Sequence, residues 1–165
     1  MQRFFVLLFF MFVCAVMAQG EELGGKVDWI YDGDTLRVDG VGKVRLLGID
    51  TPEMEASERD SFYLRLGVSR KTIRRTARAA LHFNIRHLKG KEVTLRPGTP
   101  RWDDYGRLLA YVYLSDGQMI NLMLIENGLA TVFRRYDFGQ KECFLKAEKK
   151  ARKDRQGMWK NAGKR

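Results

Sequence analysis

The feature that most constrains the fold of this chain is a short acidic turn, Asp-Gly-Asp-Thr, at residues 32–35. Three runs rich in apolar and β-branched residues adjoin it along the chain: 27–30, 35–38 and 43–49. An Asp39-Gly40 pair predicts a hairpin between the second and third runs. Polar residues therefore fall at strand ends, where a rigid sheet can hold them at fixed positions that stay open to solvent.

Carboxylates stand on both sides of these strands. Asp34 lies in the acidic turn, and Asp50 and Thr51 follow the third run. Hard divalent cations such as Ca²⁺ bind oxygen ligands, roughly six to eight of them. Asp34, Asp50 and the backbone carbonyl of Thr51 can provide part of such a shell. Asp34 is expected to be a surface carboxylate that contributes little to packing.

Three further charged residues complete a candidate catalytic set. Glu53 follows Pro52, which stiffens the backbone, so its carboxylate can orient or deprotonate an attacking water. Arg45 and Arg107 carry planar guanidinium groups, which pair with phosphate oxygens through two parallel hydrogen bonds. Taken singly, each of these residues is more often an ordinary solvated surface residue. The combination is what indicates a site.

The combination resembles the thermonuclease family, the staphylococcal nuclease-like phosphodiesterases, in residue type, order and spacing. The residues that carry the resemblance are Asp34, Arg45, Asp50, Thr51, Glu53 and the Tyr105-Gly106-Arg107 triplet. It implies that Asp34, Asp50 and the Thr51 carbonyl hold Ca²⁺ and that Glu53 acts on the nucleophilic water. It also implies that Arg45 and Arg107 clamp the phosphate and that Tyr105 reaches a substrate phosphate.

One of two base-packing positions departs from the family pattern. Family members place two aromatic residues against the nucleotide base, and the matching positions here are Arg134 and Tyr136. Tyr136 keeps the pattern. At Arg134 a guanidinium stack is expected to replace part of the aromatic contact, because arginine packs on π-faces.

The N-terminus has the pattern of a secretory signal peptide. Arg3 gives a short positive end, residues 4–17 are apolar, and Val16 and Ala18 form a small-residue cleavage pattern before Gln19. The apolar run is shorter than the ~20 residues that cross a bilayer. We therefore expect a signal peptide over 1–18, a single domain over 19–165, secretion, and no stable membrane insertion after cleavage. An uncleaved signal anchor is the alternative.

The charge of the chain indicates a polyanionic partner. The whole sequence has 30 Lys and Arg against 20 Asp and Glu. Only Arg3 of these precedes residue 19, so the predicted mature chain carries 29 minus 20, or +9. Such a surplus attracts nucleic acid. A basic protein that is merely soluble is the competing interpretation.

The remaining pattern predicts an α+β fold. Further strands are expected at 92–96 and 108–114, with a turn-rich segment at 97–104 between them. Ser69 is expected to cap a helix over 70–87, and further helices are expected over 121–127 and 138–159, with Trp159 docking the last one. Residues 54–68 show no steady period and predict a surface loop, with a short helical turn as the alternative. Both His82 and His87 lack partners at metal-ligand spacing and are interpreted as structural.

Five strands and about three helices fit a five-stranded Greek-key barrel of the oligonucleotide-binding (OB) type. With the family resemblance, this predicts a monomeric, Ca²⁺-dependent, sugar-nonspecific endonuclease that cuts DNA and RNA on the 5′-oxygen side and leaves 3′-phosphates. A catalytically inactive nucleic-acid-binding OB-fold protein is the main alternative. A cationic membrane-active protein is a weaker one, because it needs no acidic cluster matched with arginines.

Overall fold

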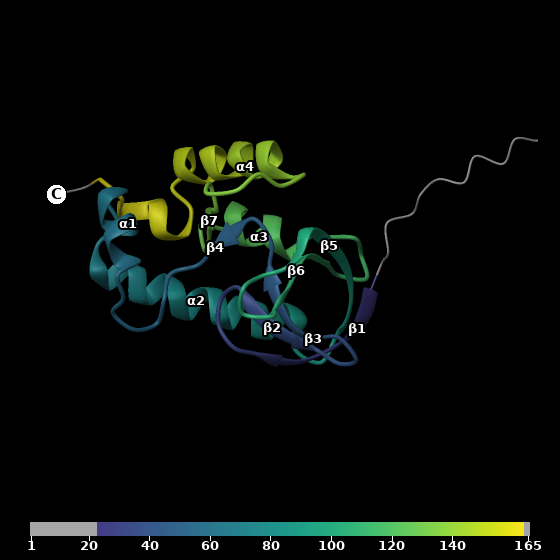
Figure 1. Ribbon diagram of the computed structural model, residues 1–165. Coiled ribbons are helices and arrows are strands. Elements are labelled where there is room, and N and C mark those ends of the chain that lie inside the picture. The colour runs from purple at the N-terminus through teal and green to yellow at the C-terminus, as the bar shows by residue number, and fades with distance from the viewer. Residues whose placement is uncertain (1–22, 164–165) are drawn as a thin grey trace, which may run out of the picture.

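Five strands close into a barrel in the computed structural model, which describes residues 23–163. Their spatial order is β1-β2-β3-β6-β5, and β5 pairs back onto β1 (Figure 1). The strands are β1 Leu23–Ile30, β2 Thr35–Val38, β3 Gly42–Leu46, β5 Glu92–Trp102 and β6 Leu108–Tyr113. Only the β3–β6 pair of this barrel is parallel. The predicted α+β class and five-stranded OB-type barrel are confirmed. The expected signal peptide lies outside the described residues.

The prediction of one continuous strand over 43–49 is wrong. The chain turns at Leu47 and Gly48, and a separate strand, β4 Ile49–Asp50, pairs with β7 Thr131–Val132 outside the barrel. Gly48 has a φ of 78°, and a Cβ built on it would lie 2.5 Å from the Phe138 ring. Glycine is therefore required at the turn on both grounds. The turn moves Asp50 onto a small second sheet.

Strand β5 is longer than expected. It continues through the segment predicted to be turn-rich as far as Trp102, with an irregular register against β6 between Pro97 and Trp102. The Tyr105-Gly106-Arg107 triplet then falls in the tight connection that leads into β6, and the N–H of Asp103 donates to the carbonyl of Arg107 at 3.0 Å. The connection holds Arg107 at the entrance to the strand, as the sequence predicts.

The described residues also form four α-helices and one 3-10 helix. They are α1 Asp60–Arg65, α2 Arg70–Leu88, α3 Ile120–Glu126, α4 Lys141–Lys153 and the 3-10 helix η1 Gly157–Asn161. The Ser69 hydroxyl accepts from the N–H of Thr72 at 3.3 Å, which confirms the predicted cap. The expected single helix over 138–159 is wrong, because α4 ends at Lys153 and Arg155 adopts a φ of 53°. No helix in the part of the chain that the structure describes is both long and apolar enough to cross a membrane.

The segment 54–68 does contain a short helix, which the sequence left open, but its placement wholly at the surface is wrong. It contains α1, whose Tyr63 is fully buried. Tyr63 belongs to a second core beside the barrel core, and this second core also contains Val68, Ile73, Ala151, Met158 and Trp159. Figure 1 shows α1 and η1 together at the start of α2, away from the barrel. Trp159 therefore docks the end of the chain, as expected, and it docks there against the segment that was interpreted as a loop.

A buried amide links α3 to the barrel. Asn121 is 0% exposed, its Oδ1 accepts from the N–H of Val112 at 2.9 Å, and its Nδ2 donates to the carbonyls of Leu47 and Ala110. The side chain thus satisfies backbone groups of β6 and of the turn after β3. Buried backbone groups without partners are costly, so this residue fixes the position of that turn.

We predict that Asn121→Ala lowers the free energy of unfolding by roughly 2–4 kcal/mol, because it leaves buried backbone groups unpaired. Urea denaturation monitored by circular dichroism measures the loss. Asn127→Ala is the matched control, because the side-chain amide of Asn127 donates to the Met123 carbonyl in an exposed hydrogen bond. For this variant the free energy of unfolding is expected to change by less than about 0.5 kcal/mol. Equal effects of the two substitutions would contradict the bridging role.

Candidate active site

The acidic turn is built against Thr51 and helix α2. Asp34 Oδ2 accepts from both the N–H and the hydroxyl of Thr51, each at 2.9 Å. A Cβ on Gly33 would lie 2.6 Å from the Thr51 hydroxyl and 2.8 Å from the Ala80 side chain, so only glycine fits between them. The Asn84 amide donates to the Gly33 carbonyl at 2.8 Å. Asp34 is consequently only 7% exposed, and the expectation that it is a surface carboxylate is wrong.

Arg45 lies between the two aspartates predicted to hold a metal. Its Nη1 contacts Asp34 Oδ1, and its Nη2 donates to Asp50 Oδ1 at 3.2 Å. The residue is 9% exposed. Burial, followed by the nearby charge of Arg107, lowers the pKa of the Arg45 guanidinium to about 10. Arg45 is therefore still a cation at neutral pH, and it holds both carboxylates at one location.

Arg107 joins the same cluster through a threonine. Its Nη1 donates to the Thr35 hydroxyl at 3.3 Å, and that hydroxyl donates to Asp34 Oδ1 at 3.3 Å. Asp103 fixes the other side of the guanidinium, since Asp103 Oδ2 lies 2.7 Å from Arg107 Nε. The Arg107 guanidinium also lies 5.4 Å from the centre of the Tyr105 ring, and Tyr105 is 84% exposed. Tyr105 is thus open to a ligand beside an anchored arginine.

Asp50 has partners that sequence reasoning missed. The Tyr63 hydroxyl donates to Asp50 Oδ2 at 3.1 Å, and Arg59 Nη2 contacts Asp50 Oδ1. Both come from the segment interpreted as a loop. The stretch around them is charged and has no hydrophobic period, so nothing in the sequence marks either residue as part of a site. Their partner Asp50 lies on β4, a different element, and local sequence does not reveal that contact. A continuous series of side-chain contacts, here called the arginine–carboxylate chain, runs through Arg107, Thr35, Asp34, Arg45, Asp50 and Arg59.

Glu53 lies at the edge of the arginine–carboxylate chain, with its side chain 44% exposed. Arg59 Nη1 is 4.0 Å from Glu53 Oε1, and Arg74 donates to the Glu53 backbone carbonyl. Partial burial, followed by the negative charge of Asp32, raises the pKa of the Glu53 carboxyl above its usual value. A half-exposed carboxylate with a raised pKa suits proton transfer. The backbone of Glu53 is held from α2, while its carboxylate remains accessible.

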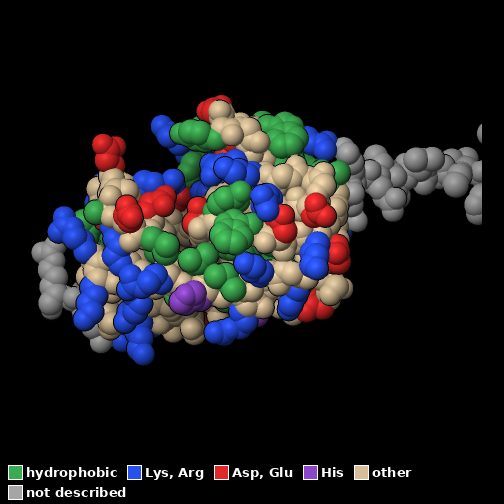
Figure 2. Space-filling view, turned by 90° about the horizontal axis from the view of Figure 1, so that it is seen from below, with side chains coloured by type: hydrophobic (Ala, Val, Ile, Leu, Met, Phe, Trp, Pro, Cys, Tyr) green, Lys and Arg blue, Asp and Glu red, His purple; other side chains and the backbone are tan. Residues whose placement is uncertain are grey.

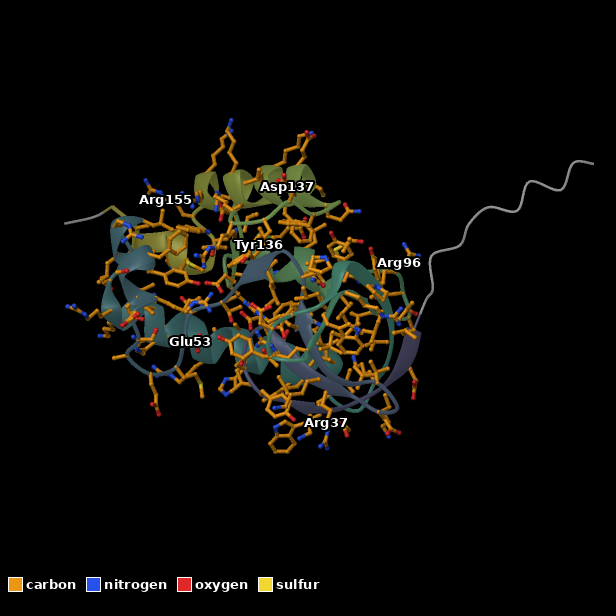
Figure 3. All side chains as sticks on the ribbon, in the orientation of Figure 1. Arg37, Glu53, Arg96, Tyr136, Asp137 and Arg155 are labelled. Atoms are coloured by element: carbon orange, nitrogen blue, oxygen red, sulfur yellow. The ribbon has the colours of Figure 1, made fainter. Side chains whose placement is uncertain are left out.

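Arg134 and Tyr136 occupy different environments. Arg134 Nη1 donates to the Val132 carbonyl at 3.0 Å, and its guanidinium pairs with Glu148, which is 2% exposed. Glu148 also accepts from the N–H of Val132 at 3.0 Å. The guanidinium assigned to base stacking is thus partly committed to a buried carboxylate. Tyr136 is 65% exposed, with its ring 5.7 Å from that of Phe133. Figure 3 shows Tyr136 and Glu53 away from Arg96 and Arg37. The substrate-binding roles of Arg134 and Tyr136 stay predictions.

The residues predicted to hold a metal lie close together around Arg45. Within residues 23–163 no three His, Cys, Asp or Glu side chains come together as a metal-binding group. The two carboxylates of Asp34 and Asp50 are nevertheless brought to one guanidinium, and Thr51 is bonded to Asp34. The predicted ligand atoms, which are the carboxylates of Asp34 and Asp50 and the carbonyl of Thr51, are all oxygens, and this suits a hard cation completed by water and substrate rather than a soft one. Neither His82 nor His87 belongs to such a group within residues 23–163, and their structural role stays a prediction.

The site can be compared with known proteins. A family model described as "Staphylococcal nuclease homologue" matches residues 43–161, which include most of the arginine–carboxylate chain. The chain belongs to this family. A protein named "Thermonuclease" from Staphylococcus hyicus is 32% identical over 154 residues, covering 91% of this chain and 83% of that protein.

Two further relatives differ in how much of their own length matches this chain. An uncharacterized protein of Methanocaldococcus jannaschii is 34% identical over 151 residues, covering 84% of this chain and 72% of its own. "Endonuclease YhcR" of Bacillus subtilis is 30% identical over 152 residues, covering 86% of this chain but only 12% of that protein. The same domain is therefore found as most of a small protein and as a small part of a large one.

We predict that Tyr63→Phe lowers the free energy of unfolding by about 1 kcal/mol, because Asp50 loses the hydroxyl that donates to it. Thermal unfolding followed by circular dichroism measures the change. Tyr113→Phe serves as the control, because the Tyr113 ring faces Arg96 at the barrel and lies outside the arginine–carboxylate chain. An unchanged stability of Tyr63→Phe would mean that Asp50 does not depend on this hydrogen bond.

Proposed function

We propose that this protein is a secreted, Ca²⁺-dependent, sugar-nonspecific endonuclease that hydrolyses phosphodiester bonds of DNA and RNA on the 5′-oxygen side. The observation that carries the proposal is the arginine–carboxylate chain, in which two arginines and two aspartates meet at the edge of an OB-type barrel. Membership of the staphylococcal nuclease homologue family supports it. Secretion rests on the signal-peptide pattern of residues 1–18.

The two arginines bind and orient the phosphate that is cut. Arg107 is anchored by Asp103 with its side chain 26% exposed, while Arg45 is buried and charged. Guanidinium groups held in place before the reaction stabilise the negative charge that grows on phosphate oxygens in the transition state. Exposed Tyr105 adds a contact to a neighbouring phosphate.

Glu53 holds the attacking water and accepts its proton. Its carboxylate is half exposed, and Arg74 and Pro52 restrain the backbone that carries it. Asp34, Asp50 and the Thr51 carbonyl would hold Ca²⁺. When bound, Ca²⁺ withdraws charge from the phosphate oxygens. The proton itself is moved by Glu53 at its carboxylate oxygens.

The surface charge suits a polyanionic substrate. Figure 2 shows Lys and Arg side chains gathered over the half of the molecule that contains α1 and α2. Exposed basic residues along α2 contribute to this surface: Arg70, Lys71, Arg75 and Arg78. Such a field raises the rate at which a nucleic acid finds the site.

We predict cleavage of both DNA and RNA in substrate-containing gels when Ca²⁺ is supplied, and loss of cleavage in excess chelator. Ca²⁺ added back after chelation restores activity, whereas Zn²⁺ does not, because the donors are all oxygens. Nucleic-acid binding by a purified protein that cuts neither substrate with Ca²⁺ present would instead support the inactive OB-fold alternative.

We predict that Glu53→Gln lowers the turnover rate roughly a hundredfold to ten-thousandfold, because the amide keeps the shape but cannot accept the proton. Initial rates on single-stranded DNA at saturating Ca²⁺ measure the loss, and calorimetric Ca²⁺ affinity is expected to change far less. Glu55→Gln is the matched control, as Glu55 is exposed two residues further along. Wild-type turnover in Glu53→Gln would assign the base to another group.

A further inference from the structure

Two large aromatic side chains are exposed beside the acidic turn. Trp29 lies on β1 and is 49% exposed, and Tyr31 follows the end of this strand and is 37% exposed. Ile30 between them is buried in the barrel core. Because side chains alternate along an extended backbone, the rings on either side of Ile30 both point outward. Exposed aromatic rings that lie together indicate an interaction surface.

A lysine lies over each of these rings. Lys89, which follows α2, places its Nζ 4.4 Å from the centre of the Trp29 ring, and Lys43 of β3 places its Nζ 4.9 Å from that of Tyr31. Neither lysine forms an ion pair with another residue of the described part of the chain. The cation–π contacts restrain the rings, and the ammonium charges are not compensated by a carboxylate. These four residues are here called the aromatic–lysine platform.

A further cation borders the platform. Arg37 of β2 pairs with Trp29 on one side and with Lys43 on the other, so the three residues form a row across neighbouring strands. Asp28, next to Trp29 in the chain, is bound by Arg37, whose Nε is 2.9 Å from both carboxylate oxygens. Figure 3 labels Arg37 at the lower edge of the molecule, and Figure 2, seen from below, shows hydrophobic side chains among Lys and Arg. An anion that approaches the rings therefore meets the charge of both platform lysines.

The platform adjoins the candidate active site. The N–H of Tyr31 donates to the carbonyl of Thr35 at 2.9 Å, and the hydroxyl of Thr35 belongs to the arginine–carboxylate chain. Tyr31 also comes only three residues before Asp34. Trp29 lies two residues further back, which is roughly 7 Å along an extended backbone. A nucleic-acid strand bound at the arginine–carboxylate chain can therefore continue over both rings.

We propose that the aromatic–lysine platform is an accessory binding site for single-stranded nucleic acid outside the catalytic centre. Bases stack on Trp29 and Tyr31, and neighbouring backbone phosphates contact Lys43 and Lys89. Rings combined with cations bind single strands without selecting a sequence, because every base has a π-face. A single strand is the occupant rather than a duplex, because the bases of a duplex are already stacked on one another. The proposal rests on the proposed function, since it adds a contact to the same substrate.

The first test measures binding without cleavage. A labelled deoxythymidine oligonucleotide of about 12 units, within the range that single-strand sites cover, carries phosphorothioate linkages, and fluorescence anisotropy follows its binding in chelator. Trp29→Leu keeps apolar volume without a π-face and is expected to weaken binding roughly 5- to 150-fold, the range of a lost base–aromatic stack. Trp29→Phe keeps a ring and is expected to retain most of the affinity. Circular dichroism checks that both variants fold, and wild-type affinity in Trp29→Leu would overturn the proposal.

The second test distinguishes a phosphate contact from general attraction. Lys89→Ala is expected to reduce the slope of log K against log salt by about 0.7, the value for one phosphate contact on a single strand. Lys149→Ala is the matched control, because Lys149 is an exposed lysine of α4, which Figure 1 shows on the opposite side of the molecule from β2 and β3. The control is expected to keep the wild-type slope. Equal slopes for the two variants would show attraction by net charge alone and would overturn the proposal.

The third test separates the platform from the proposed function. With Ca²⁺ present, Trp29→Leu is expected to raise KM for long single strands far more than for dinucleotides, which reach only the active site. If oligonucleotide binding depends on Trp29 but the wild-type protein cuts nothing, the nuclease proposal fails and the platform stands. If the protein cuts and Trp29→Leu binds and cuts long strands as the wild type does, the platform fails and the nuclease proposal stands. A protein would then be the partner to test on the exposed rings.

Discussion

The structure depends on a buried arginine that is shared by two aspartates. Arg45 lies on strand β3 of the barrel. Its guanidinium contacts Asp34 of the acidic turn and Asp50 on the small second sheet. A charge removed from water must be compensated, so burial of Arg45 requires both carboxylates to stay in place. Such a buried group need not add net stability over an apolar core, but loss of one partner is costly. The constraint thus fixes the relative positions of three segments.

A second framework holds the same carboxylates from outside the barrel. Helix α1 turns Tyr63 toward Asp50, and Arg74 of α2 binds both Asp60 and the carbonyl of Glu53. Trp159 packs into the core that contains Tyr63, which links the end of the described chain to the site. The geometry of the site is therefore determined by packing in two separate cores. Aspartates positioned in this way can be close together without being mobile.

Much of the fold could be predicted because its signals are local. Runs rich in apolar and β-branched residues marked the barrel strands, Ser69 marked the start of α2, and Asp39-Gly40 marked a hairpin. The predictions failed where a distant contact decided the outcome. The strand breaks at Gly48, where a positive φ and the nearby ring of Phe138 leave room only for glycine. The segment 54–68 has no regular hydrophobic period, so its sequence does not predict that it is buried. Its buried residues pack into a core to which α2, α4 and η1 contribute.

The sequence by itself determined the residue types of the site, their order, and the barrel that carries most of them. These follow from strand patterns and from the pairing of acidic turns with arginines, which short stretches of sequence reveal. Only the tertiary structure decided that Asp34 is buried, that Arg59 reaches Asp50, and that Arg134 turns toward Glu148. Each of these contacts joins different elements of the chain. Local propensity carries no information about such partners, because the energy of an ion pair depends on where the fold places the opposite charge.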